Sequence, residues 1–81
     1  MTHQYEFHVQ DVTCEKCEVR IREALESLPG AEQIELVRTP QDEAEVVFRS
    51  RQTIEPHTIE SVIEQKSQGT THHYQVRWAT S

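Results

Sequence analysis

Residues 5–28 read YEFHVQDVTCEKCEVRIREALESL, and the spacing of the apolar residues changes once within this stretch. Residues 5–9 alternate between apolar and polar, and a period of two predicts a strand with one buried face. From about residue 13 to residue 28 the apolar residues recur every three or four positions, which predicts an amphipathic helix. Thr13 is the expected N-cap of this helix, and Pro29-Gly30 is expected to end it.

The downstream sequence predicts three more strands and a second helix. Residues 33–37 and 44–49 alternate in the same way, and the turn-forming residues 39–42 between them indicate a hairpin. Residues 56–66 have a helical apolar stripe and begin with a proline, which suits the first turn of a helix. Residues 73–78 alternate again and predict the last strand.

The element order is therefore strand, helix, strand, strand, helix, strand. This order predicts an α+β fold, the ferredoxin-like sandwich, with a four-stranded antiparallel sheet and both helices on one face. The expected inward-facing strand residues are Tyr5, Phe7, Val9, Ile34, Leu36, Ala44, Val46, Phe48, Val76 and Trp78. The open face is expected to carry Glu6, His8, Gln75 and Arg77.

Composition excludes several classes of protein. The chain has 81 residues, so one domain over residues 1–81 is expected. Its formal net charge is −6, so it would be repelled by nucleic acid and by anionic membranes. No apolar run is long enough to insert into a bilayer. The N-terminus lacks the features of a secretion signal, so a cytoplasmic location is expected. The start at Met1 and the short tail after Trp78 favour a free-standing protein over part of a transporter.

The pair Cys14 and Cys17 is the one motif that carries chemistry. A helix N-terminus has unpaired N–H groups and a partial positive charge, and Lys16 adds another charge, so both favour the thiolate. Thiolates prefer soft ions, and two of them satisfy Cu(I) more readily than Zn(II), which usually takes four ligands. Taken alone, the pair could also be a redox dithiol, or Cys17 could be simply a small buried residue.

The chain resembles the heavy-metal-associated domain, the family of small copper chaperones and of the N-terminal domains of metal-transporting P-type ATPases. Residues 11–17, DVTCEKC, are similar to the family motif Gly-Met-Thr-Cys-x-x-Cys. Residues 25–31, LESLPGA, resemble the end of the family's first helix, and 44–48, AEVVF, and 59–64, IESVIE, resemble its third strand and second helix. The resemblance covers roughly residues 4–66.

The resemblance implies a non-enzymatic protein that binds Cu(I) or another soft ion through Cys14 and Cys17. It also implies a partner that accepts the metal, such as a P-type ATPase or another metal-binding domain. Three departures bear on the site: Asp11 replaces the family glycine, Val12 replaces the methionine as an apolar tether, and the loop 67–73 is longer than usual.

Several residues near the loop could join the site. Lys66, His72 and His73 are candidates from the loop, and Asp11 adds a carboxylate. The Asp11 carboxylate and the histidines favour an alternative function, a Zn(II), Cd(II) or Hg(II) binding or regulatory domain. A dithiol–disulfide oxidoreductase is a lower-ranked alternative, and a metal-bridged homodimer fits either metal. The side chains expected to be ordinary surface or core groups are His3, His8, His57, Tyr74 and Trp78.

Overall fold

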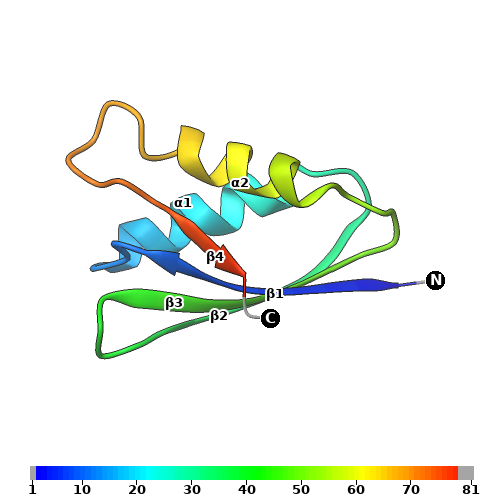
Figure 1. Ribbon diagram of the computed structural model, residues 1–81, viewed down its shortest axis with the longest axis horizontal. Coiled ribbons are helices and arrows are strands. Elements are labelled where there is room, and N and C mark those ends of the chain that lie inside the picture. The colour runs from blue at the N-terminus through cyan, green and yellow to red at the C-terminus, as the bar shows by residue number, and fades with distance from the viewer. Residues whose placement is uncertain (1, 79–81) are drawn as a thin grey trace.

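A computed structural model describes residues 2–78 of the chain. Its elements follow the expected order (Figure 1): β1 (His3–Gln10), α1 (Glu15–Glu26), β2 (Ala31–Arg38), β3 (Glu43–Ser50), α2 (Pro56–Gln65) and β4 (Val76–Trp78). Pro56 opens α2 as predicted, at the position where its missing N–H is not needed. The last strand is shorter than predicted, because the chain leaves the long loop only at Gln75 and joins the sheet ladder from Val76.

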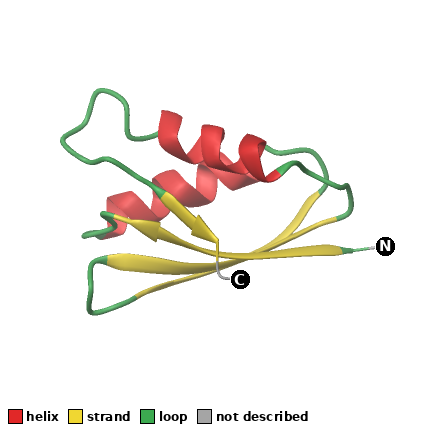
Figure 2. Cartoon of the chain, in the orientation of Figure 1, coloured by secondary structure: helices red, strands yellow, loops and turns green. Residues whose placement is uncertain are grey.

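The four strands form one antiparallel sheet in the order β2-β3-β1-β4. Both helices lie on the same side of this sheet, and its other side is open (Figure 2). The central pair is in register, with Phe7 opposite Val46 and Val9 opposite Ala44. The predicted ferredoxin-like α+β sandwich is therefore confirmed.

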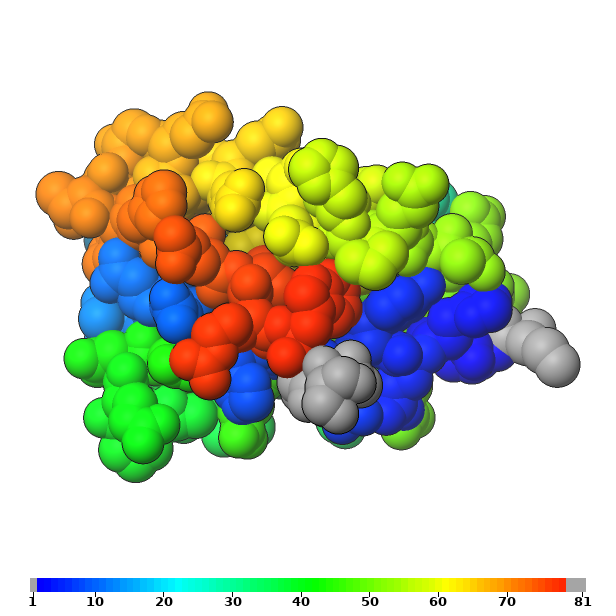
Figure 3. All heavy atoms as spheres, in the orientation of Figure 1, coloured from blue at the N-terminus to red at the C-terminus, as the bar shows by residue number. Residues whose placement is uncertain are grey.

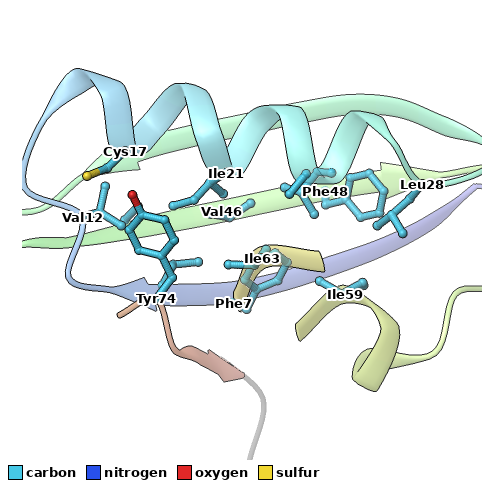
Figure 4. Close-up of a cluster of buried hydrophobic side chains, with 14 of the residues drawn as sticks. Phe7, Val12, Cys17, Ile21, Leu28, Val46, Phe48, Ile59, Ile63 and Tyr74 are labelled. Atoms are coloured by element: carbon cyan, nitrogen blue, oxygen red, sulfur yellow. The ribbon is translucent and has the colours of Figure 1, made fainter. Parts of the chain in front are cut away.

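The core lies between the sheet and the two helices (Figure 4). Alternation along β1 and β3 turns every second side chain toward the helices, as the period of two requires. The predicted inward residues divide into a buried set and a partly buried set that packs against it. The buried set comprises Phe7, Val9, Ala44, Val46 and Phe48, and the partly buried set comprises Tyr5, Ile34, Leu36, Val76 and Trp78.

Four of the partly buried residues lie on the edge strands β2 and β4, and Tyr5 lies near the start of β1. Tyr5 and Trp78 nevertheless have their polar atoms paired. The Tyr5 hydroxyl accepts the Ile54 amide hydrogen at 2.8 Å, and Trp78 Nε1 donates to Glu60 at 3.0 Å. Ile54 is a core residue that the sequence patterns did not single out.

The open face carries the expected polar residues. Glu6, Gln75 and Arg77 are exposed there, and His8 is half-buried beside Glu45 at 3.4 Å. No helix within residues 2–78 is long and apolar enough to cross a membrane.

The turn between α1 and β2 depends on one glycine. Gly30 adopts φ +75°, a left-handed conformation that side chains rarely adopt. A Cβ at this position would lie 3.1 Å from the Ser50 hydroxyl and 3.1 Å from the Gln52 amide nitrogen. The helix itself ends earlier than predicted, at Glu26 with Ser27 as its C-cap. Gly30 forms the turn that follows and lets β2 approach the end of β3.

Candidate metal centre

Both cysteines lie at the start of α1. Cys14 is the N-cap (φ −151°, ψ 171°), and its carbonyl accepts the amide hydrogens of Cys17 and Glu18 at 3.1 and 3.3 Å. The prediction that Thr13 caps the helix is wrong. The first helical hydrogen bonds go to the carbonyl of Cys14, so the helix begins one residue later and the exposed Thr13 side chain lies outside it. The Cys14 side chain makes no capping bond, which leaves its sulfur unused by the helix.

The two sulfur atoms face each other. Cys14 Sγ and Cys17 Sγ are 3.4 Å apart, and both thiols are free. Cys14 is half-buried, whereas Cys17 is fully buried in the core cluster. The site thus offers one accessible sulfur and one anchored sulfur beside the unpaired amides of a helix N-terminus.

A tyrosine hydroxyl reaches the anchored sulfur. Tyr74 is fully buried, and its hydroxyl points toward the sulfur of Cys17 (Figure 4). Arg20 Nη1 in turn donates a hydrogen bond to that hydroxyl at 3.3 Å. Burial and the hydrogen bond with Cys17 raise the pKa of Tyr74, so its hydroxyl stays protonated and can donate to a thiolate.

Hydrogen bonds favour the ionised form of Cys17. Burial by itself raises the pKa of this thiol, since a buried charge loses solvation. Hydrogen bonds from the Tyr74 hydroxyl, from the backbone of Thr13, and from the side chain and backbone of Cys14 outweigh burial and lower the pKa to about 7. The surrounding hydrogen bonds therefore favour the thiolate of Cys17, which is the form that binds metal.

Asp11 ties the metal loop to the loop that follows α2. Its backbone has φ +64°, a left-handed conformation that aspartate tolerates better than most residues other than glycine. Its Oδ2 accepts the amide hydrogen of His73 at 2.8 Å and lies 3.6 Å from Nδ1 of His72. Asp11 thus combines a left-handed backbone conformation with a side-chain link to residues 72–73.

Two further contacts hold the metal loop in place. The buried Val12 side chain fills the expected role of an apolar tether, and its amide donates to the Asp42 carbonyl at 2.9 Å. Arg38 Nη1 donates to the Thr13 carbonyl at 3.2 Å, and Arg38 Nε lies 3.6 Å from a Glu18 carboxylate oxygen. The loop is therefore anchored from the core and from the β2–β3 hairpin.

Of the three loop candidates, the structure brings one to the cysteines. A ligand atom of His72 lies with the two sulfurs in a group whose members are all within 4.8 Å of one another. His73 contributes its backbone amide to Asp11, while its side chain is exposed. Lys66 extends instead toward Glu23 on α1, with a 3.9 Å separation between Nζ and the carboxylate.

The end of the molecule that holds the site is built from three segments far apart in the sequence. Figure 3 shows the orange loop after α2 above the blue segment around the start of α1, with the green β2–β3 turn below. Among residues 2–78, Cys14, Cys17 and His72 form the group of three side chains that could hold a metal ion. His3 and His57 are not part of this group. His3 is hydrogen-bonded to Thr53, and His57 is exposed.

Sequence reasoning missed the role of Arg20 and of the Tyr74 hydroxyl. The alternation of the last strand predicts that Tyr74 is buried, and this is confirmed. The pattern contains no signal for the direction of the hydroxyl, which depends on how the long loop returns across α1.

The sequence model of the heavy-metal-associated domain matches residues 6–70. The chain therefore belongs to the heavy-metal-associated domain family, as the motif and element order predicted. The match includes both cysteines and ends at residue 70, before His72 and Tyr74. No curated protein matches the chain in a sequence search. The donor set fits a soft metal ion, because thiolate sulfur and imidazole nitrogen are the ligands that such ions prefer.

Proposed function

We propose that this protein is a cytoplasmic, non-enzymatic carrier of Cu(I), made of one domain over residues 1–81, and that Cys14 and Cys17 bind the metal. One observation carries this proposal: two free thiols 3.4 Å apart open α1 in a member of the heavy-metal-associated domain family. Two soft sulfur donors suit Cu(I), whereas Zn(II) usually requires four ligands.

Unequal access to the two sulfurs supports transfer by ligand exchange. In the proposed reaction, a thiol of the partner loses its proton and forms a bond to the metal beside the accessible Cys14. The metal–Cys14 bond then breaks, and the released thiolate takes up a proton. Cys17 stays bound until a second partner thiolate replaces it in the same way. The coordination number rises and falls by one at each step, so no uncoordinated ion is formed.

The exposed face of α1 is the proposed docking surface for the partner. Val19 is an apolar side chain on this face and is 53% exposed. It lies in an open depression whose other lining residues are Glu15, Lys16, Arg20 and Glu23. Glu15 and Lys16 lie between the two cysteines in the sequence, so a partner seated on this depression would be close to the metal loop. We propose a metal-accepting domain, such as that of a P-type ATPase, as the partner, with the net charge of −6 favouring a basic surface.

An anaerobic competition titration tests the proposal. The reduced protein would be titrated with Cu(I) against a chromophoric chelator, and Cys14→Ser, Cys17→Ser and the double variant would be compared with it. We expect tight one-to-one binding by the natural sequence and its loss in the double variant. Thr13→Ala is the matched control, since this exposed side chain lies beside Cys14 and makes no capping bond. Retention of tight binding by the double variant would refute the proposal.

A second candidate function is binding or sensing of Zn(II), Cd(II) or Hg(II). The observation that favours it is the position of His72, which adds a nitrogen donor to the two sulfurs. The same titration run with Zn(II) separates the two candidates. Cu(I) binding that far exceeds Zn(II) binding favours the carrier, and the reverse order favours the second candidate. Size measurement with and without metal would also detect a metal-bridged homodimer.

A further inference from the structure

We propose that His72 is a third metal ligand and that Asp11 is the residue that positions it. This inference rests on the part of the proposed function that both candidate functions share, a metal site at Cys14 and Cys17, because it adds a donor to that site. The class of ligand is a soft or borderline ion, Zn(II) or Cd(II) in particular, held by two sulfurs and one nitrogen. A partner thiolate or water would take the remaining position.

The distances allow the three donors to reach one ion. The two sulfurs are 3.4 Å apart, and all three ligand atoms are within 4.8 Å of one another. With metal–sulfur bonds of ~2.3 Å and metal–nitrogen bonds of ~2.0–2.1 Å, donors around one ion are separated by roughly 3.5–4 Å. The ligand atom of His72 therefore has to move toward the sulfurs by about 1 Å at most. The two sulfurs have to move apart by about half that distance.

The imidazole is already held in place. Its ring stacks on the ring of Tyr74, with centroids 5.9 Å apart and an interplanar angle of 13°. The His72 amide donates to the Thr70 hydroxyl at 3.1 Å, and the next amide, of His73, donates to Asp11 at 2.8 Å. The side chain is only 23% exposed. Binding a metal would therefore immobilise little that is not already ordered.

Asp11 would select the nitrogen that binds the metal. Nδ1 of His72 lies 3.6 Å from Asp11 Oδ2, so a proton on Nδ1 faces a carboxylate. Nε2 would then be the nitrogen that binds the metal. Metal-binding histidines commonly give their other ring N–H to a carboxylate, which fixes the tautomer and makes the ring a better donor.

Nuclear magnetic resonance of the full chain loaded with ¹¹³Cd(II) tests the proposal directly. We expect a resolved coupling between ¹¹³Cd and Nε2 of His72, and none to His73. His72→Ala should weaken Cd(II) binding by about tenfold or more. The adjacent His73→Ala is the matched control, because it keeps the backbone amide that donates to Asp11. The ¹H–¹⁵N spectrum of each variant establishes that it is folded.

Asp11→Asn separates positioning from ligation. Asparagine keeps an acceptor for the His73 amide and tolerates a positive φ, but it removes the carboxylate charge. We expect Nε2 of His72 still to be coupled to ¹¹³Cd, with Cd(II) bound more weakly than by the natural sequence. Equal affinity in this variant would overturn the role of Asp11.

The outcomes distinguish this inference from the proposed function. Binding of Cd(II) to both cysteines with no coupling to His72, and with unchanged affinity in His72→Ala, would overturn the inference and leave the two-thiolate site standing. Failure of the natural sequence to bind Cd(II), Zn(II) or Cu(I) would overturn both.

Discussion

Replacing Tyr74 with phenylalanine should raise the pKa of the Cys17 thiol from about 7 toward its ordinary value of 9.0. The hydroxyl is one of several groups that stabilise the thiolate, and the variant removes it while keeping the ring in the core. A hydrogen bond to a charged group contributes about 1.5–3 kcal/mol, and one pKa unit corresponds to ~1.4 kcal/mol. The backbone groups of Thr13 and Cys14 and the Cys14 thiol still stabilise the thiolate in this variant. We therefore expect the pKa of Cys17 to rise by about one unit.

The change is measured from the ¹³Cβ shifts of both cysteines in the reduced, metal-free protein as a function of pH, which resolves Cys17 from Cys14. At pH 7 a rise of one unit lowers the thiolate fraction of Cys17 from about one half to about one tenth. Tyr5→Phe is the matched control, because the Tyr5 hydroxyl pairs with the Ile54 amide. The reasoning fails if the Cys17 midpoint stays near 7 in Tyr74→Phe, or if Tyr5→Phe moves it equally.

Two further predictions concern stability. Gly30→Ala should lower the free energy of unfolding by roughly 1–3 kcal/mol in urea titrations, because it combines a positive φ with 3.1 Å contacts to neighbours. Gly69 has φ +79° with nothing within 4 Å of an added Cβ, so Gly69→Ala should lower the free energy of unfolding by less. An equal decrease in the two variants would show that crowding at Gly30 has no effect. The reduced, metal-free protein should also gain stability with rising pH relative to Cys17→Ala. The pKa of Cys17 is lower in the folded than in the unfolded chain, so the contribution is absent below about pH 7 and complete above about pH 9, with an upper bound of about 3 kcal/mol. A constant difference between the two proteins over this range, from denaturant midpoints, would contradict the assigned pKa.

The fold was predictable because its signals are local. The alternation along β1, the helical spacing from Cys17 to Leu28 and the proline at the start of α2 each act within a few residues. Their order then leaves few ways to pack two helices on four strands.

The site was predictable only in part. The cysteine pair is a local motif, and its position before a predicted helix indicated that the sulfurs would meet. The bond from His73 to Asp11 joins residues 62 positions apart, and the bond from Arg20 to Tyr74 joins residues 54 apart. Such contacts depend on the path of the long loop, and no periodicity in the sequence encodes that path. For the same reason, the sequence could not indicate that His72 reaches the cysteines and that Lys66 does not.

The burial of Cys17 couples metal binding to the lifetime of the protein. Its sulfur belongs to the core cluster, so an ion bound there holds together the start of α1 and the segments packed around it. A ligand present at one hundred times its Kd adds about 2.7 kcal/mol to the free energy of unfolding. That is a large share of the roughly 5–15 kcal/mol typical of a whole domain. Metal-bound molecules would therefore resist proteases that degrade metal-free ones, and the supply of metal would set the abundance of this protein.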